Sequence, residues 1–330
     1  MKMIDLHVCP STLAEGFETY SPVAVKHFLD GKKVSHILPY ETIPSEPFRE
    51  QFYENRTAMS LSGAQSKYSV LIDNGLFRLT RRGEQGTYIL KPALADFENP
   101  FSGPANEHLT MQIASQVFGI ETAKCGLCFT EHGEQAYLVK RYDVNPDGSK
   151  IQQEDFASLA GLSAAIFGAN YKYDALSYED IGVLIKKYLP AWRIEVVKFF
   201  DLILFNYLFA NGDAHLKNFS ILKTTDGDYK LAPAYDLVNT LIHIPNDSIF
   251  ALRKGLYNGW KDHYVTGTDF LECAKRIGVT DKVAKTELDR FRADYSAIDS
   301  LINRSFLTDE LKENYRNIYK VRLNSFLREN

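Results

Sequence analysis

Apolar and polar residues alternate over short runs in the first half of the chain, which predicts antiparallel strands. Two such runs, 68–72 and 76–80, flank Asp73-Asn74-Gly75. Asn-Gly tolerates positive φ, so this sequence favours a two-residue hairpin turn. Two further apolar strands are expected at 87–90 and 136–142. Residues 105–118 have apolar side chains at helical spacing and predict a helix, with Gly119 as its C-cap.

Longer apolar periods in the second half predict a mostly helical region. One short hairpin interrupts it, with strands at 220–223 and 229–232 around Asp226-Gly227. The pattern indicates an α+β fold in which a small β-rich lobe precedes a larger helical lobe. The expected helices are 156–167, 178–188, 194–210, 270–277 and two or three more after residue 281.

Changes in the periodicity of apolar residues and in the frequency of proline predict three segments. Residues 1–59 lack a clear period and are broken by prolines, so we expect an irregular arm with one helix near 23–29. Residues 60–145 are expected to form the β-rich N-lobe, and residues 146–330 the helical C-lobe.

Composition narrows the class of protein. The chain has 330 residues, of which 45% are hydrophobic and 24% charged, and its formal net charge is −4 at pH 7. This balance is typical of a globular protein and gives no overall attraction to nucleic acid or to an anionic membrane. The most apolar stretch, 196–210, is shorter than the roughly 20 residues of a membrane span and contains Asp201. We therefore expect neither direct nucleic-acid binding nor a membrane span.

Cysteine usage indicates a reducing compartment. The chain has four cysteines, too few for a secreted disulfide scaffold, and its first residues lack the pattern of a signal peptide. A cytoplasmic location is expected. Cys125 and Cys128 form a single C-x-x-C, which is either a pair of small apolar residues on a strand or a zinc or redox site.

The candidate chemistry lies between the apolar helix and the short hairpin. Asp213 and Asn218 stand five residues apart there, and Asp236 follows the hairpin. Phosphoryl transfer needs a carboxylate that deprotonates the incoming hydroxyl and oxygen ligands for Mg²⁺. Asp213 suits the first task, and Asn218 and Asp236 suit the second. Their order and spacing match the catalytic parts of protein kinases, which predicts a two-lobed protein-kinase-like fold.

Each of these residues has a simpler interpretation. A single Asp-x₄-Asn is common in solvated loops, and Asp236 alone is a suitable helix N-cap. His215 either shapes the loop by hydrogen-bonding to its backbone or contacts a phosphate or Asp213. Lys217 either contacts a phosphate or is solvated. The combination of these residues around one strand pair favours the catalytic interpretation.

The first half supplies matching parts for nucleotide binding. Small residues at 60–67 would let backbone N–H groups approach phosphates, although an ordinary turn is the alternative. Lys91 ends an apolar strand and can reach phosphates, with Glu107 on the next helix as its ion-pair partner. The alternative is a surface lysine and a surface glutamate. Residues 137–143 resemble a strand that runs into an inter-lobe hinge, where the backbone reads adenine and Asp143 binds ribose; the alternative is an ordinary edge strand.

In this order, the motifs resemble the HipA family of bacterial serine/threonine kinases, the toxins of toxin–antitoxin modules. The His two residues after Asp213 is also similar to lipid-kinase loops. The matching segments span about 180 residues: SLSGAQSK at 60–67, YILKP at 88–92, NEH at 106–108, LVKRYD at 138–143, NGDAHLKNFS at 211–220 and LAPAYDL at 231–237.

The resemblance implies an ATP- and Mg²⁺-dependent protein serine/threonine kinase. It implies that Asp213 is the base, that Asn218 and Asp236 hold Mg²⁺, that Lys91 binds ATP phosphates, and that the Lys140–Tyr142 backbone holds adenine. The 60–67 loop would cover the phosphates and carry an autophosphorylated serine that switches the kinase off. The implied loop residues are Ser60 with Ser62 as the second phosphorylation candidate, and Gly63, Ala64, Gln65 and Lys67 at the nucleotide.

The resemblance also implies partners. The family typically phosphorylates aminoacyl-tRNA synthetases and thereby halts translation. Only 59 residues precede the 60–67 loop, and the segment 9–26 and the Ser-x-Ser loop look like the short HipT branch. In that branch a separate small protein supplies the N-terminal subdomain and acts as the antitoxin, so we expect it as a partner together with a DNA-binding antitoxin. Two alternatives are a small-molecule or lipid kinase and an inactive module that bridges a DNA-binding antitoxin.

Overall fold

The computed structural model describes five stretches of the chain, which form two compact units. The described residues are 6–39, 67–93, 102–258, 265–292 and 295–328. The first unit comprises Met1–Gln112, Ala123–Lys150 and Ser300–Lys312. The second unit comprises Ile113–Thr122, Ile151–Asp299 and Glu313–Asn330. Each unit therefore contains segments that are distant in sequence.

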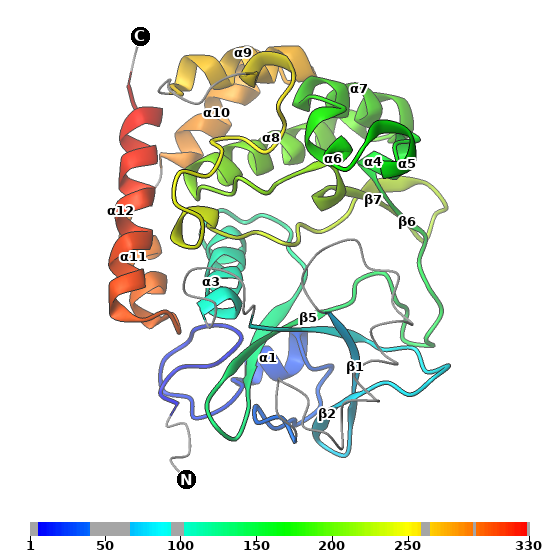
Figure 1. Ribbon diagram of the computed structural model, residues 1–330, viewed down its shortest axis with the longest axis vertical. Coiled ribbons are helices and arrows are strands. Elements are labelled where there is room, and N and C mark those ends of the chain that lie inside the picture. Colours follow the sequence, from blue (N-terminus) through cyan, green and yellow to red (C-terminus); the bar gives the residue numbers. More distant parts are fainter. Residues whose placement is uncertain (1–5, 40–66, 94–101, 259–264, 293–294, 329–330) are drawn as a thin grey trace. The chain divides into compact units, whose positions relative to one another are not determined.

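The first unit is built on a five-stranded antiparallel sheet (Figure 1). Its strands run in the order β2-β1-β3-β5-β4. The predicted hairpin is confirmed: Asn74 and Gly75 have φ of 49° and 75°, the left-handed conformation that this turn requires. The strands are β1 (Tyr68–Asp73), β2 (Leu76–Leu79), β3 (Tyr88–Pro92), β4 (Cys125–Phe129) and β5 (Gln135–Lys140).

The C-x-x-C pair lies on β4, and both thiols are buried and unoxidised. Residues three apart on a strand point to opposite faces of the sheet, so these two sulfurs do not face one site. The described residues also contain no group of three or more metal-ligating His, Cys, Asp or Glu side chains. The interpretation as small buried residues on a strand is therefore correct.

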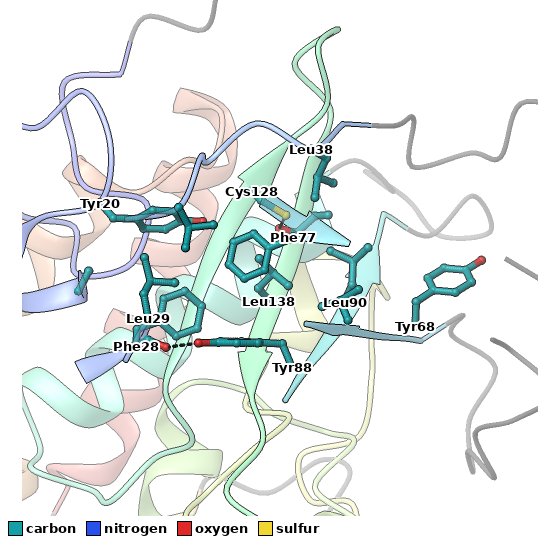
Figure 2. Close-up of a cluster of buried hydrophobic side chains, with 14 of the residues drawn as sticks. Tyr20, Phe28, Leu29, Leu38, Tyr68, Phe77, Tyr88, Leu90, Cys128 and Leu138 are labelled. Carbon is teal, nitrogen blue, oxygen red and sulfur yellow. Dashed lines mark hydrogen bonds between the residues drawn. The ribbon is translucent and has the colours of Figure 1, made fainter. Parts of the chain in front are cut away.

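Aromatic rings fill the core of the first unit (Figure 2). The Tyr88 ring lies edge-on to Phe28 and Phe77, with centroids 5.5 and 5.4 Å away, and its hydroxyl donates to the Phe28 carbonyl at 2.7 Å. Phe28 follows α1 (Pro22–His27), which confirms the helix expected near 23–29. Although most of residues 6–39 is irregular, this segment supplies one side of the core.

Helix α3 (Gly103–Gln116) confirms the helix expected over 105–118. Gly119 has a φ of 63° and ends it as predicted. The helix supplies Glu107 and the buried His108 to the first unit and runs on into the second. Burial lowers the pKa of His108 to about 4, and its Nε2 lies 2.8 Å from the Ser11 carbonyl.

The second unit is mostly helical, as expected, and carries a three-stranded sheet in the order β6-β7-β8. The hairpin expected at 220–223 and 229–232 is present, and β6 adds an unpredicted strand. The strands are β6 (Gln153–Asp155), β7 (Ser220–Lys223) and β8 (Tyr229–Leu231). Its helices are α4 (Phe156–Leu159), α5 (Ala164–Phe167), α6 (Tyr171–Asp174), α7 (Tyr178–Tyr188), α8 (Trp192–Leu208), α9 (Gly267–Ile277) and α10 (Asp281–Phe291). Two further helices, α11 (Tyr295–Arg304) and α12 (Asp309–Phe326), have residues in both units.

The single helix predicted over 156–167 is wrong. The chain breaks into α4 and α5 because Gly161 has a φ of 70° and Ser163 is extended. These two backbone conformations are incompatible with a continuous helix. The apolar spacing on which the prediction rested belongs to two separate turns.

Helix α8 is the centre of the second unit and packs against α7, α9 and α10 (Figure 1). It is buried on most sides, as its apolar sequence predicts. Phe205 and Phe209 stack at 4.4 Å, and Phe118 stacks on Phe291 at 4.6 Å. In the described part of the chain, no helix combines the length and the apolar character of a membrane span.

Candidate active site

The loop that follows α8 leaves the helix by a sharp turn. Ala210 takes a φ of 51°, and the N–H of Asn211 still donates to the Asn206 carbonyl at 2.8 Å. The N–H of Gly212 donates to the Thr240 hydroxyl at 3.0 Å. A β-carbon on Gly212 would lie 2.7 Å from the Ser248 carbonyl oxygen and 2.3 Å from Asp247 Oδ2, so a larger residue requires this backbone to shift.

Two asparagine amides connect the predicted catalytic residues. The Asn211 oxygen accepts from the N–H of Asp213 at 3.2 Å, and its Nδ2 lies 3.5 Å from the Asp236 carbonyl. Asn218 Nδ2 donates to the Asp213 carbonyl at 2.9 Å. Asn206 on α8 accepts from Asn211 Nδ2 at 2.9 Å. The structure therefore brings Asp213, Asn218 and Asp236 into one hydrogen-bonded network.

Asp236 has an unusual backbone. Its φ of 55° is uncommon for a residue with a β-carbon, and such conformations cluster at functional sites. The preceding Tyr235 is fixed to the loop, because its hydroxyl donates to the Lys217 carbonyl at 2.8 Å and contacts the Ser220 hydroxyl at 2.5 Å. The alternative role of Asp236 as a helix N-cap is wrong, since the next helix is the 3-10 helix Thr240–Ile242 and its N-cap is Asn239.

The arrangement fits Mg²⁺ in its chemistry. Because Asn218 Nδ2 donates to Asp213, the Asn218 amide presents its oxygen as a ligand. In the described residues no cluster of three acidic, His or Cys ligands exists, so Asn218 and Asp236 would supply only part of a coordination shell. Mg²⁺ is commonly held in this way, with one or two protein oxygens and the rest from phosphates and water.

The carboxylate of Asp213 receives a hydrogen bond that the sequence did not predict. The Tyr173 hydroxyl, on the four-residue helix α6, donates to Asp213 Oδ1 at 2.5 Å. Burial, then this bond, raises the pKa of Tyr173, so the phenol stays a protonated donor. No period or motif marks Tyr173, which lies 40 residues before Asp213 in the sequence.

His215 is buried in the loop beside Tyr173. Its N–H donates to the Asp213 carbonyl, its carbonyl accepts from the N–H of Asn218, and its ring lies edge-on to Tyr173 at 5.2 Å. Burial lowers the pKa of His215 against the opposing pull of Asp213, which keeps the ring neutral at pH 7. The loop is shaped by the His215 backbone. The Nδ1 of the His215 ring is buried and has no hydrogen-bond partner among the described residues.

Lys217 forms an ion pair within the unit. Its Nζ lies 2.7 Å from Asp155 Oδ2, and the other Asp155 oxygen accepts from the N–H of Ser158 and caps α4. The solvated alternative for Lys217 is wrong, because its ammonium group is paired with Asp155; the phosphate contact stays a prediction. The ion pair instead ties the loop to the end of β6.

In the first unit, the predicted ion pair of Lys91 and Glu107 is confirmed. Lys91 Nζ lies 2.6 Å from Glu107 Oε1, and the two side chains are 4% and 10% exposed. The ammonium group also lies 5.3 Å from the centre of the Tyr137 ring. The surface interpretation of this lysine and glutamate is wrong, because β3 and α3 bury them together.

The predicted hinge is partly occupied by contacts of its own unit. The N–H of Lys140 donates to the Lys124 carbonyl at 2.7 Å, and the N–H of Arg141 donates to the Thr87 carbonyl at 2.9 Å. The Lys140 side chain pairs with Asp30. Arg141 binds both carboxylate oxygens of Asp143. The Lys140 and Arg141 N–H groups can therefore bind adenine only if they give up these hydrogen bonds. Asp143 can likewise bind ribose only if it gives up its contact with Arg141.

The predicted phosphate loop lies almost entirely outside the described residues. This applies to Ser60, Ser62, Gly63, Ala64 and Gln65. Lys67 is described and stands directly before β1.

Comparison with known proteins places these features in a family. Residues 59–298 match the model of the HipA-like C-terminal domain. A Haemophilus influenzae protein named "Putative kinase" is 27% identical over 94% of this chain and 93% of its own length. "Putative kinase Y4mE" of Sinorhizobium fredii is 32% identical over 69% of this chain, which spans 52% of that relative.

Two solved structures share the fold. One is HipA of the Shewanella oneidensis toxin–antitoxin system, solved in a complex with HipB and operator DNA. Its TM-score is 0.62 at 21% sequence identity, and the match covers 80% of this chain and 63% of the HipA chain. The Helicobacter pylori proinflammatory kinase CtkA has a TM-score of 0.54 and 16% identity, covering 81% of this chain and 91% of its own. The mixed architecture of antiparallel sheet and helices is thus common to all three.

Proposed function

The chain belongs to the HipA-like C-terminal domain family, and we propose that it is an ATP- and Mg²⁺-dependent protein serine/threonine kinase. The observation that carries the proposal is the network in which two asparagine amides hold the backbones of Asp213 and Asp236. In the proposed mechanism Asp213 accepts the proton of the acceptor hydroxyl. The oxygens of Asn218 and Asp236 hold Mg²⁺, which neutralises charge on the phosphates when it is bound.

The buried ion pair of the first unit supports the nucleotide half of the proposal. A lysine at the end of a strand, held by a glutamate of the next helix, is the arrangement by which protein kinases bind ATP phosphates. Lys91 and Glu107 meet that description at 2.6 Å. We therefore extend the proposal to a two-lobed protein-kinase-like fold in which Lys91 binds the phosphates of ATP.

We propose further that the protein is the toxin of a toxin–antitoxin system and belongs to the short HipT-like branch. The motifs at 9–26 and 60–67 support the branch, and the HipA of the Shewanella complex, solved with HipB, supports an antitoxin partner. The proposed target is a translation component such as an aminoacyl-tRNA synthetase. Phosphorylation of Ser60 or Ser62 would regulate the kinase, because nearly two negative charges beside a triphosphate repel it.

Incubation with ATP and Mg²⁺, followed by mass spectrometry of the intact chain and its peptides, tests the activity. We expect one or two phosphates on Ser60 or Ser62, and a loss of about 10²- to 10⁴-fold in rate for Asp213→Asn, which removes the base. Circular dichroism of the variant controls for folding. Equal rates for Asp213→Asn and the wild type would refute the assignment.

A second incubation, with labelled ATP and a bacterial lysate, separates the proposed protein kinase from a small-molecule or lipid kinase. A labelled polypeptide supports the proposal, and a labelled small molecule contradicts it. The absence of any shift in melting temperature with ATP and Mg²⁺ would favour the inactive binding module instead.

A further inference from the structure

Tyr173 has a position relative to Asp213 that nothing in the catalytic motif specifies. Its hydroxyl lies 2.5 Å from Asp213 Oδ1. Within the described part of the chain, no other side chain hydrogen-bonds to this carboxylate. The asparagine network holds the backbone of Asp213, at its N–H and carbonyl, but leaves rotation of the side chain open. The rotamer of the candidate base is therefore held by one phenol.

Contacts with Arg253 and with His215 keep Tyr173 in place. Its carbonyl accepts from the N–H of Arg253 at 3.1 Å, and the Arg253 guanidinium lies 5.3 Å from the centre of its ring. The neighbouring Asp174 forms an ion pair with Arg253 at 3.3 Å. On another side, the His215 ring meets the phenol edge-on. A side chain held in this way is suited to orient Asp213, because it stays in one position.

The hydrogen bond from Tyr173 also makes the two oxygens of the Asp213 carboxylate different. A carboxylate accepts hydrogen bonds at both oxygens. Since Tyr173 uses Oδ1, Oδ2 is the oxygen left to receive a second hydroxyl. We propose that Tyr173 is a positioning residue for phosphoryl transfer, which orients Asp213 so that Oδ2 meets the acceptor hydroxyl. This inference rests on the proposed function.

In the step that Tyr173 supports, the acceptor oxygen forms a bond to the γ-phosphorus of ATP. The bond between that phosphorus and the β,γ-bridging oxygen breaks, and ADP leaves with the electron pair. The proton of the acceptor hydroxyl passes to Asp213 Oδ2. The phenol proton of Tyr173 stays on its oxygen throughout.

The first experiment compares Tyr173→Phe with the wild type and with Tyr171→Phe. Tyr171 lies on the same short helix and its hydroxyl makes no hydrogen bond among the described residues, so it is a matched control. The readout is the single-turnover rate of phosphate incorporation into the chain at saturating ATP and Mg²⁺. We expect Tyr173→Phe to slow it between about 10- and 100-fold, the worth of a hydrogen bond to a charged group. The Kd for ADP with Mg²⁺ and the rate of Tyr171→Phe should stay within twofold of the wild type.

The second experiment needs no activity. Melting temperatures of the wild type, Tyr173→Phe, Asp213→Ala and the double variant form a cycle. If the contact exists in solution, Tyr173→Phe lowers the melting temperature of the wild type but not that of Asp213→Ala. Additive effects of the two substitutions would show that the contact is absent.

The two experiments separate the possible failures. A rate of Tyr173→Phe equal to or above that of the wild type overturns the positioning role, even if the melting cycle shows the contact. A wild type that transfers no phosphate, while the melting cycle shows coupling, overturns the proposed function and the positioning role with it, and leaves only the hydrogen bond. A slower Tyr173→Phe whose Kd for ADP also rises tenfold indicates a distorted loop, which likewise contradicts the proposal.

Discussion

The two units treat buried charge in opposite ways. In the first unit, Lys91 and Glu107 neutralise each other at 2.6 Å and are almost fully buried. In the loop of the second unit, the Asp213 carboxylate accepts from the neutral Tyr173 phenol, and the Asn211 amide contacts the backbones of Asp213 and Asp236. The nearby cation Lys217 is already paired with Asp155.

The two arrangements differ in whether they need a counter-charge from a bound ligand. A buried ion pair needs no further counter-charge, and its lysine is presented in a fixed position. In the described residues the Asp213 carboxylate accepts a hydrogen bond from a neutral phenol and forms no ion pair, and a bound cation is one way in which proteins balance such a group. The proposed Mg²⁺ would supply this counter-charge at the loop, whereas the ion pair of Lys91 and Glu107 needs none.

Removing one member of the ion pair should produce the largest change in stability. Lys91→Met leaves Glu107 buried without its cation, so we expect the free energy of unfolding to fall by about 3–5 kcal/mol. Urea denaturation measures it. The double variant Lys91→Met/Glu107→Leu replaces the pair by apolar groups and should recover most of the loss. If Lys91→Met alone costs less than about 1 kcal/mol, the pair is not buried in solution, and the contrast between the units disappears.

A smaller effect is expected where the loop is held by shape instead of charge. Gly212→Ala drives a β-carbon against Asp247 and the Ser248 carbonyl, so we expect a loss of about 1–3 kcal/mol. Gly103→Ala is the control, because a β-carbon there meets nothing within 4 Å. Thermal denaturation compares the two variants. Equal melting temperatures would mean that the loop moves freely away from Asp247 and is not the rigid network described above.

Asp201 is expected to give the stability a pH dependence, which tests how the second unit treats charge away from the loop. Asp201 and Glu287 both pair with Arg290, through contacts of 2.5 and 2.7 Å. Burial, opposed by Arg290 and aided by Glu287, raises the pKa of Asp201 to about 7. The folded state therefore binds this proton more tightly than the unfolded state, and the stability it contributes is present below about pH 4 and is lost as the pH rises towards 7.

We expect the wild type to lose stability between pH 5 and 7 with a slope of up to about 1.4 kcal/mol per pH unit from this group. Asp201→Asn should remove that part of the slope. Urea denaturation at pH 5, 6, 7 and 8 measures both proteins. Parallel curves for the two proteins would show that Asp201 is ionised throughout, as an ordinary partner of Arg290.

Prediction from sequence succeeded where the signal was local or periodic. The Asn-Gly turn at 74–75 and helix α7 were placed correctly, because turn chemistry and apolar spacing are properties of neighbouring residues. The ion pair of Lys91 and Glu107 was also predicted, from a lysine at the end of an apolar strand and a glutamate on the helix that follows it. The helix at 156–167 failed because Gly161 and Ser163 adopt conformations that apolar spacing does not encode.

The types and order of the candidate catalytic residues, Asp213, Asn218 and Asp236 around one hairpin, can be read from the sequence. The contacts that hold these residues become visible only in the folded chain. Tyr173 reaches Asp213 from a helix of four residues, and Asp155 takes the charge of Lys217. Such contacts join segments 40 to 62 residues apart. They depend on how α8 and the β6-β7-β8 sheet pack, which no spacing along the chain specifies.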